Sequence, residues 1–382
     1  MKKILWISMN APYDSVAHGG GKTHNYYLKG LKRAQDDIRL LSFALENERA
    51  KSDLDDYHIE HEIKYYPDNF SRILKMIDIY FYSMKEIKRY KKEGYEPDVI
   101  ILQWTQMAFL IRYIKHFYSK AKYVVVEEDV TFLSYKRFVA YHKNIIKKAI
   151  YQIIYGVVKV LELDSIKQSH KTICSNRKDA NLLLDAGMSP DIVTNWAPYY
   201  QEVAGTEYIG NTRDIVFYGA MGRPENHLSA VWFIENVLPL VKHLGVRFVI
   251  VGGGAKEEIK KMENEQIKVL GFVEDLEPIF STALCMSAPL VLGAGIKIKV
   301  IEGLSAGLPV ITNKIGIEGI DAVDGRDYIF ATTPEEHAKA IEKLLVDEAY
   351  RMEMSRNAKA FIENEFNLEA NLKMFQELIE QI

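Results

Sequence analysis

The stretch PLVLGAGIKIKVIEGLSAGLPVIT, residues 289–312, carries the clearest fold signal in the chain. Its glycine-rich turn at 293–295 is followed by apolar residues at helical spacing, which predicts a helix over about 297–306. Gly307 then ends that helix, and the apolar run 308–312 predicts a buried strand. A turn, a helix and a buried strand in this order are typical of a parallel α/β domain.

Two charged side chains stand inside this predicted helix. Lys299 and Glu302 are three residues apart, so they share one helical face. One interpretation is an ordinary pair on the surface, which would contribute little. The other is a buried pair, because apolar strands flank the helix; burial of charged side chains is costly and would indicate a functional role. Free backbone N–H groups, a lysine and a carboxylate at one helix N-terminus suit a diphosphate and a sugar hydroxyl. The motif therefore indicates a nucleotide-activated ligand.

Composition and length restrict the class of protein. A chain of 382 residues with 48% apolar and 26% charged residues is typical of a soluble protein with two domains. Cys174 and Cys285 show neither a disulfide framework nor zinc spacing, so we expect a reducing cytoplasm. Residues 1–9 resemble the start of a signal peptide but lack a small-residue cleavage site, which favours a core strand. No apolar run reaches the roughly 18 residues of a membrane span.

Charge is distributed unevenly between the two halves. Residues 1–200 contain 31 Lys and Arg against 24 Asp and Glu, whereas residues 201–382 contain 18 against 28. The balance of +7 against −10 predicts two domains with different partners; the alternative is a drift of surface charge. A pI of about 6.4 and the absence of a recognised module argue against nucleic-acid binding.

Strand and helix patterns alternate along the chain, which predicts two doubly wound, Rossmann-like domains with parallel sheets. The polar segment 199–211 is the predicted linker between them. The expected ligand site faces the carboxyl ends of both sheets. The predicted strands are 3–9, 38–44, 98–103, 123–127, 171–175 and 191–194, then 214–218, 247–251, 269–272, 284–288, 310–312 and 328–330. The predicted helices are 23–34, 69–93, 134–168 and 176–186, then 228–243, 255–264, 275–281, 297–306, 335–347, 350–363 and 367–382.

The first glycine cluster, 19–21, lies between the first predicted strand and the first predicted helix. Backbone without Cβ atoms can approach a phosphate closely, and a helix N-terminus favours the negative charge. Lys22 and Thr23 follow these glycines as in a P-loop, and residues 123–129 would be the acidic partner strand. The spacing does not fit, because a P-loop requires glycine at position 16, which is Val16 here. A flexible turn is the other alternative.

Two further segments allow both a structural and a functional interpretation. The glycines at 252–254 follow a predicted strand, but Glu257 stands where a dinucleotide fingerprint needs glycine, which favours a tight strand-to-helix turn. In GFVED, residues 271–275, either the backbone meets a nucleotide base or Asp275 simply caps a helix.

The sequence gives little support for a bound metal. The ten histidines show no paired spacing, and Asp53 and Asp55 lie in a charged, solvated stretch. The carboxylates at 127–129 suit Mg²⁺, but we expect neither a metal nor another cofactor.

A basic segment rich in tyrosine and isoleucine spans residues 134–159. It either lies on an anionic membrane and delivers a lipid-linked or polymer acceptor, or it is a solvated basic face. Its basic residues are Lys136, Arg137, Lys143, Lys147, Lys148 and Lys159.

Four segments of the second half stand in the order and spacing of a known family. They are IVFYGAMGRPENHLSAVWFIENVLP (215–239), RFVIVGGG (247–254), VLGFVEDLEPIFSTALCMSAP (269–289) and GAGIKIKVIEGLSAGLPVITNKIGIEGI (293–320). They resemble the donor-binding half of retaining glycosyltransferases of the GT-B fold, family 4. The first half is similar mainly in layout, through the loop at 19–21 and the segments 173–187 and 194–198.

The resemblance implies a nucleotide-sugar donor, bound in a cleft between the two domains. Glu302 would accept hydrogen bonds from the ribose hydroxyls, and Lys299 would neutralise the diphosphate with Arg223 as a helper. The backbone of Gly20 and Gly21 would close on that diphosphate from the first domain. The other implied donor contacts are Gly222, Gly253, Phe272, Val273, Gly293, Ala294, Gly295, Ile296 and Lys297.

The resemblance also implies that the last helix, 367–382, packs on the first domain, so the domains are 1–200 with 367–382, and 201–366. Two positions depart from the family pattern. Ala294 replaces a motif glutamate, as it does in a branch with a GxG motif, and EED at 127–129 replaces an acceptor-side histidine. Sugar recognition is therefore expected to be non-standard.

The implied activity is transfer of a sugar, with retention and without a metal, to a glycan, lipid-linked or protein acceptor in surface polysaccharide or glycoconjugate synthesis. The leaving diphosphate takes the acceptor proton, or Glu128 or Asp129 acts as the base. The expected location is the cytoplasm, at the inner face of the membrane if the basic segment binds there. Two alternatives stay open: a sugar-nucleotide epimerase on the same fold, and a non-catalytic partner subunit.

Overall fold

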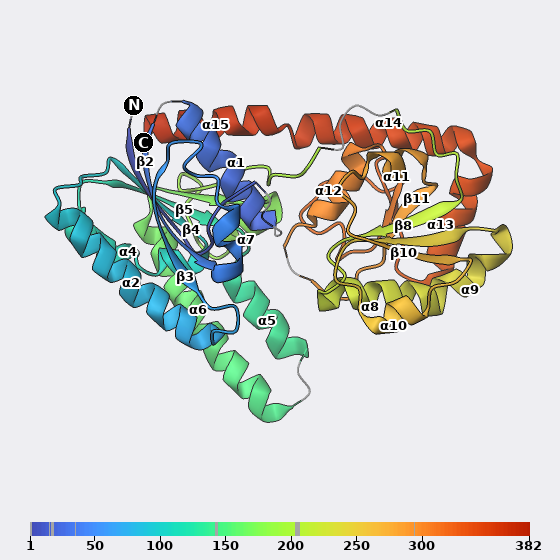
Figure 1. Cartoon of the computed structure of the whole chain (residues 1–382), viewed down its shortest axis with the longest axis horizontal. Helices are drawn as coiled ribbons and strands as arrows, with labels where there is room; N and C mark the ends of the chain where they lie inside the picture. Colours follow the sequence, from blue (N-terminus) through green and yellow to red (C-terminus); the bar gives the residue numbers. More distant parts are fainter. Residues whose placement is uncertain are drawn as a thin grey trace. The chain divides into compact units, whose positions relative to one another are not determined.

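The computed structural model describes residues 2–14, 16, 19–34, 36–141, 144–202, 207–293 and 295–382. The chain forms two compact units, Met1–Tyr199 with Leu368–Ile382, and Tyr200–Asn367. These bounds lie within one residue of the sequence-based ones at each junction. Each unit has its own parallel sheet with helices on both faces (Figure 1), so the prediction of two Rossmann-like α/β domains is confirmed.

The sheet of the first unit has the strand order β3-β2-β1-β4-β5-β6-β7, with neighbouring strands parallel. Its central strands are continuous apolar runs, as expected for strands buried on both faces. The strands are β1 (Lys3–Ser8), β2 (Asp37–Leu45), β3 (Glu60–Tyr66), β4 (Val99–Gln103), β5 (Lys122–Glu127), β6 (Lys171–Cys174) and β7 (Val193–Asn195).

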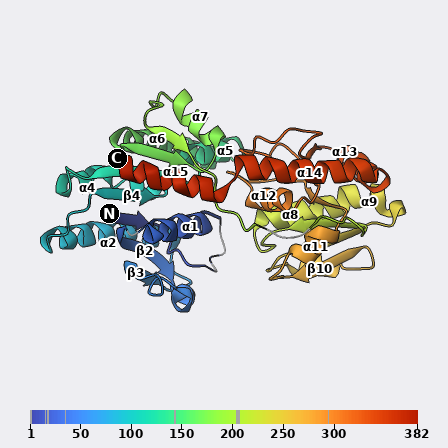
Figure 2. The same cartoon turned by 90° about the horizontal axis from the view of Figure 1, so that it is seen from above.

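Helices cover this sheet in two layers (Figures 1 and 2). α1 and α15 pack together on one face, where Phe375 meets Trp196 with 4.9 Å between ring centroids and Tyr27 stacks on Trp196 at 3.8 Å. α2, α4 and α6 follow one another on the other face. The helices are α1 (Gly19–Arg33), α2 (Arg72–Lys92), α3 (Thr105–Ala108), α4 (Ile111–Phe117), α5 (Thr131–Tyr141), α6 (Ile145–Gln168), α7 (Arg177–Asp185) and α15 (Leu368–Gln381).

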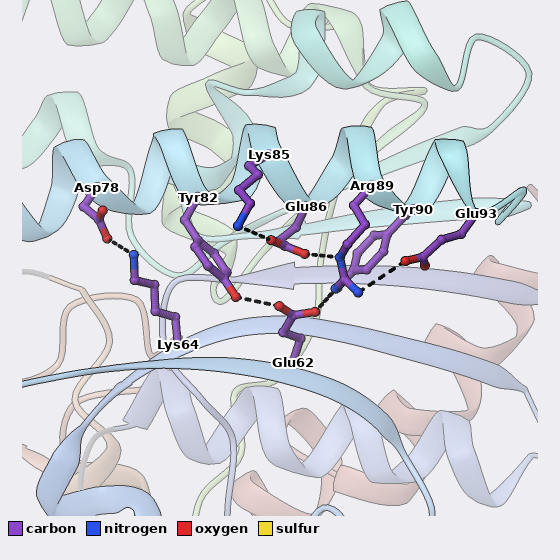
Figure 3. A network of polar contacts seen from close by, with 9 residues as sticks. All are labelled: Glu62, Lys64, Asp78, Tyr82, Lys85, Glu86, Arg89, Tyr90 and Glu93. Atoms are coloured by element: carbon purple, nitrogen blue, oxygen red, sulfur yellow. Dashed lines mark hydrogen bonds and ion pairs between the residues drawn. The ribbon is translucent and has the colours of Figure 1, made fainter.

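The edge strand β3 was not predicted, because its sequence EHEIKYY is largely charged. Two of its charged residues, Glu62 and Lys64, are paired with side chains of α2 (Figure 3). Glu62 accepts a hydrogen bond from Tyr82 at 2.5 Å and another from Arg89, and Lys64 pairs with Asp78 at 2.5 Å. Charged side chains suit an edge strand, where they also oppose pairing with another chain.

Two predicted boundaries in the first unit are wrong. The predicted helix 134–168 is α5 followed by α6, and the Asn144 side chain caps α6 by accepting from the Ile146 and Lys147 amides at 3.0 and 3.1 Å. The cluster 19–21, predicted as a loop, forms the first turn of α1. Lys143 and the adjacent residue 142 lie outside the described residues.

The sheet of the second unit has the order β10-β9-β8-β11-β12-β13, again parallel. β8, β9 and β12 have the predicted bounds, and in each of them consecutive β-branched or aromatic residues mark the strand. The strands are β8 (Asp214–Tyr218), β9 (Arg247–Val251), β10 (Ile267–Gly271), β11 (Cys285–Ala288), β12 (Val310–Thr312) and β13 (Ile329–Phe330).

The predicted helix 228–243 is a composite of α8, a π-helical turn at Phe233–Val237, α9 and a 3₁₀ turn at Lys242–Leu244. The π-helical turn places Phe233 on Phe248, stacked with 4.1 Å between centroids. The helices are α8 (Pro224–Trp232), α9 (Leu238–Val241), α10 (Glu257–Lys261), α11 (Glu277–Thr282), α12 (Ile298–Ser305), α13 (Pro334–Val346) and α14 (Glu348–Glu365). Within the described residues, no helix combines the length and the hydropathy that a bilayer crossing requires.

Candidate functional site

The helix α12 begins at the carboxyl edge of the second sheet, directly after β11. Gly293 and Gly295 have φ values of +140° and +70°, which side chains other than glycine rarely adopt. Lys297 precedes the first helical residue, and its amine donates to the Gly295 carbonyl and lies 4.0 Å from Glu318. Ile296 is half-buried in the same turn, and Ala294 lies outside the described residues. The turn therefore holds its own lysine close to the helix N-terminus.

The side chain of Lys299 lies in a confined space between α12 and the end of β8. Its amine donates a hydrogen bond to Asn226 Oδ1 and lies 5.1 Å from the centre of the Phe217 ring. A Cβ on Gly219 would come within 2.7 Å of that amine. Glycine is therefore required at position 219 for the lysine to reach this place.

Burial lowers the pKa of the Lys299 amine to about 7, with Glu225 and Glu302 opposing the shift and Arg223 and Lys297 adding to it. A buried amine of this kind is half-neutral near pH 7, because charging it without a partner costs desolvation energy. An anion that bound beside it would stabilise its charged form further. The site is therefore matched to a negatively charged ligand.

Glu302 lies on the same side of α12 as Lys299, as the spacing predicts, and its side chain is 3% exposed. It accepts a hydrogen bond from the Gln201 amide at 3.2 Å. Burial first, and then Glu302, raise the pKa of the Tyr218 hydroxyl. Lys299 and Glu302 therefore both meet the carboxyl end of β8, one at Gly219 and the other at Tyr218.

Asn226 is a site residue that the sequence analysis missed. It accepts from Lys299, and its amide group donates to the Ala220 carbonyl at 2.9 Å, so it connects the lysine to the loop after β8. The available signal was a polar residue in the first turn of a helix, directly after a buried strand and Pro224. Only the fold shows that Asn226 faces α12.

The glycines at 252–254 form a tight turn packed against the loop that follows β8. A Cβ on Gly252 would stand 1.9 Å from the Gly219 carbonyl oxygen, and one on Gly254 would stand 3.0 Å from the Gly222 amide nitrogen. The Met221 amide also donates to the Gly253 carbonyl at 2.8 Å. The structure thus supports the strand-to-helix turn rather than a dinucleotide fingerprint.

Arg223 and Phe272 are two exposed side chains of the predicted donor site. Arg223 precedes α8, and its guanidinium pairs with Glu225 at 2.5 Å. Phe272 follows β10 directly and is 80% exposed, with its Cβ 3.7 Å from the position of a Cβ on Gly253. Val273 is half-buried beside it, and Asp275 accepts from the Glu277 amide at 3.0 Å, which favours capping of α11.

In the first unit, Gly20 and Gly21 lie in the first turn of α1, at the carboxyl end of β1. A Cβ on Gly20 would stand 3.0 Å from Trp104 Cζ2 and 3.2 Å from Glu128 Cδ. This close packing, rather than loop freedom, requires glycine at position 20. Contact of this backbone with a diphosphate stays a prediction.

Glu128 lies at the carboxyl end of β5 beside this turn. It accepts from the Gln103 amide and from the Ser175 hydroxyl, the latter at 3.0 Å. Burial raises the pKa of Glu128 to about 8; Asp129 adds to the shift, and the Ser175 hydrogen bond opposes it. Near neutral pH the carboxyl is therefore mostly protonated, and its two oxygens accept from Gln103 and Ser175. The neighbouring Asp129 is exposed.

Trp104 is a second residue that the sequence analysis missed. It follows β4 with a φ of +72°, a value unusual for a bulky residue, and its amide donates to the Val126 carbonyl at 2.9 Å. Backbone strain of this kind occurs where the surrounding structure enforces it, often at ligand sites. The half-buried indole is thereby held beside Gly20 and Glu128.

Two of the candidate metal ligands, Glu127 and Asp53, and the nearby Glu162 have structural partners. Glu127 accepts from the Thr105 hydroxyl, and Glu162 accepts from the Thr131 and Phe132 amides at 2.7 and 2.8 Å, which joins α5 and α6 to β5. Lys29 pairs with both Asp14 and Asp53 at 2.7 Å. Among the residues that the structure describes, no group of three or more His, Cys, Asp or Glu is arranged to hold a metal ion.

Comparison with protein families assigns the second unit. Residues 212–347 match the sequence model of the family Glycosyl transferases group 1. The match includes Lys299, Glu302, Asn226 and both glycine turns, so the side chains described around α12 lie inside the matched segment.

Three proteins are similar over nearly the whole chain. A Klebsiella pneumoniae protein, "Uncharacterized 44.6 kDa protein in cps region", is 22% identical over 391 residues, 96% of this chain and 97% of that protein. Anabaena HepE, solved with UDP, aligns over 100% of both chains at 12% identity and a TM-score of 0.72. Sucrose-phosphate synthase from Thermosynechococcus elongatus aligns over 100% of this chain and 99% of that one, at 13% identity and a TM-score of 0.75. The structural likeness is one of fold and covers both units.

Proposed function

We propose that the protein is a retaining glycosyltransferase of family 4, which transfers a sugar from a nucleotide-sugar donor to a glycan or lipid-linked acceptor. The observation that carries this proposal is the buried amine of Lys299 at the start of α12, inside the segment that matches the group 1 family. A relative named for its place in a cps region supports a role in surface polysaccharide synthesis.

The donor nucleotide binds at the carboxyl edge of the second sheet. The diphosphate lies against Lys299 and the amides of residues 295–297, and the ribose hydroxyls donate to the carboxylate of Glu302. The exposed ring of Phe272 is placed to contact the base. Anabaena HepE, which shares this fold, is solved with UDP, and this supports a uridine nucleotide as the first candidate.

The reaction breaks the bond between the anomeric carbon and the diphosphate oxygen and forms one to an acceptor oxygen. Negative charge develops on the diphosphate as it leaves, and Lys299 stabilises it as the ammonium ion. The acceptor hydroxyl loses its proton in the same step. Because the raised pKa of Glu128 keeps that carboxyl protonated near neutrality, Glu128 orients the acceptor, and the diphosphate oxygen takes the proton. Lys299 thus supplies the positive charge of the site, and we propose no metal or cofactor.

The acceptor binds the first unit beside Trp104 and Glu128. An indole held at one edge suits the apolar face of a sugar ring, and a carboxyl donor suits a sugar hydroxyl. This pair takes the part of the acceptor-side histidine that the chain lacks.

Screening nucleotide sugars by thermal shift, followed by transfer assays, tests the proposal. The Lys299→Met variant keeps most of the packed stem, and we expect kcat/KM to fall about 10³-fold, equivalent to about 4 kcal/mol. Lys261→Met is the matched control, because Lys261 is an exposed lysine of α10 in the same unit, and it should retain full activity.

Three outcomes would contradict the proposal. Normal turnover by Lys299→Met would remove Lys299 from the reaction. An altered sugar after incubation with donor alone would instead indicate an epimerase. Absence of binding to any nucleotide would indicate a non-catalytic partner subunit, to which the alanine at 294 already points.

A further inference from the structure

The helix α6 carries an apolar stripe that the protein leaves exposed. We define the α6 stripe as Ile146, Ile150, Ile153, Val157 and Val160, which repeat at helical spacing and so share one face. Each of them is more than half exposed, from 51% to 72%. Apolar residues at this spacing normally face a core.

The opposite face of α6 is occupied by α5. Tyr155 meets Phe132 of α5 with 6.5 Å between centroids, and Tyr151 stacks on Phe138 at 5.4 Å. The partner of α6 within the fold is thus already in place, and the stripe faces away from it. An apolar surface about 20 Å long, four helical turns, calls for a second partner.

A second exposed apolar patch lies on the same face of the first sheet. We define the α2 patch as Ile73, Leu74, Ile77 and Phe81, which lie on one side of the N-terminal half of α2 and are 47% to 73% exposed. α4 contacts both α2 and α6, so the three helices form one layer (Figures 1 and 2). Both N-terminal halves lie toward the carboxyl edge of the sheet, because α2 follows the end of β3 and α6 returns toward the start of β6.

The charge around the α6 stripe identifies the kind of partner. Residues 131–161 contain six Lys and Arg and no Asp or Glu. Lys136, Lys147 and Lys148 are exposed, and so are Lys85 and Lys88 on α2. An exposed apolar stripe on a segment whose charges are all basic fits a surface that offers hydrocarbon and negative charge together, which is an anionic bilayer.

We propose that the α6 stripe and the α2 patch dock the first unit on an anionic lipid bilayer, with the helices lying in the plane of the headgroups. This goes beyond the proposed transfer reaction and does not depend on it. If both hold, the carboxyl edge with Trp104 and Glu128 adjoins the docked surface, where a lipid-linked acceptor would be presented. A second copy of the chain fits less well, because a two-fold contact through α6 would bring two acid-free, basic segments together.

Co-sedimentation of the full chain with vesicles tests the proposal. We expect the wild type to bind vesicles containing phosphatidylglycerol at low salt, and to bind phosphatidylcholine vesicles far more weakly. The stripe variant Ile150→Ser/Ile153→Ser/Val157→Ser should lose at least about tenfold in partitioning. The matched control Ile209→Ser/Val323→Ser/Val346→Ser replaces exposed apolar residues of the second unit and should bind like the wild type.

A second variant tests the electrostatic contribution to vesicle binding. It remains informative even if the stripe variant does not fold. Lys147→Ser/Lys148→Ser should weaken binding about fivefold per lysine at low salt, and the loss should shrink at high salt. Circular dichroism and nucleotide-induced thermal shifts report folding. Because vesicle binding is measured without nucleotide, failure of the proposed transfer reaction would leave this result unaffected.

The proposal is overturned if the wild type does not bind anionic vesicles at low salt, or if the stripe and charge variants both bind as well as the control. It is also overturned if sedimentation velocity shows a dimer that the stripe variant converts to a monomer, because a second copy would then cover the stripe.

Discussion

The carboxyl edges of the two sheets bury different ionisable groups: carboxyl groups in the first unit, and an amine beside a carboxyl group in the second. In the first unit these are Glu127, Glu128 and Glu162, whose pKa values burial raises. In the second unit they include Lys299, whose pKa burial lowers to about 7. The net charge of each half has the other sign, +7 in the first and −10 in the second. Net charge thus describes the outer surface, whereas the strand ends decide the chemistry of each site.

The glycines at the two edges also differ in what surrounds them: a Cβ on Gly20 would meet side chains, whereas a Cβ on Gly252 would meet backbone. The largest predicted effect is therefore the destabilisation of the second unit by a substitution at position 252. Gly252→Ala puts a Cβ 1.9 Å from the Gly219 carbonyl oxygen at a φ of +133°. We expect a loss of about 4 kcal/mol or more in unfolding free energy, about 10 °C in Tm, measured by thermal unfolding.

Gly253→Ala is the matched control for this substitution. Its Cβ would lie 3.7 Å from the nearest atom, Phe272 Cβ, without a positive φ, so the change should stay within about 1 kcal/mol. Equal destabilisation by the two variants would show that the turn does not hold the loop after β8 as described.

The different buried groups predict opposite pH dependence of stability. In the first unit, Glu128 and Glu162 have folded pKa values of about 8 and 7, above their usual 4.5, so the folded state holds more protons between pH 4.5 and 8. Stability there falls as pH rises, by about 1 kcal/mol or more. In the second unit, the pKa of Lys299 is lowered from 10.5 to about 7. Between these two pH values the unfolded state holds more protons than the folded state, so stability increases as pH rises above 7.

Hydrogen exchange measured separately on β5 and β8 reports the two units within the intact chain. Between pH 7 and 8, we expect the opening free energy of β5 to fall while that of β8 rises. Parallel changes in both strands would contradict the contrast.

The smallest predicted effect sharpens the role of Glu128. Because this carboxyl is mostly protonated near neutrality, Glu128→Gln resembles the resident form, and at pH 7 stability should change by less than about 1 kcal/mol. Above pH 8 the variant should be the more stable, since it has no carboxyl to ionise. Transfer activity should stay within about tenfold of wild type; a loss as large as that of Lys299→Met would instead make Glu128 the base.

Local sequence was sufficient where consecutive β-branched or aromatic residues mark a strand. The bounds of β8, β9 and β12 agree with the prediction for this reason. It failed for β3, because Glu62 and Lys64 are matched by partners on α2 that only the tertiary fold supplies. It also failed at 19–21, where packing of Gly20 on Trp104 and Glu128 outweighs the low helix propensity of glycine.

The sequence predicted the charged pair of the site, but not the residues that position it. The spacing of Lys299 and Glu302 is a local signal, and the structure places both at the end of β8. Asn226 and Trp104 have no such signal, because a hydrogen bond across 73 residues and a φ enforced by packing arise from the fold.

Calorimetry of nucleotide-sugar binding tests the central claim, that the buried amine of Lys299 is the counter-charge for a diphosphate. With the ligand that gives the largest thermal shift, titrations at pH 8 in buffers of different ionisation enthalpy measure proton uptake. The free amine is mostly neutral at this pH, and a bound diphosphate favours its charged form, so binding should take up a substantial fraction of a proton and weaken as pH rises above 7. Lys299→Met should abolish the uptake. Tight binding by the wild type without proton uptake, or the same uptake by Lys299→Met, would contradict the account.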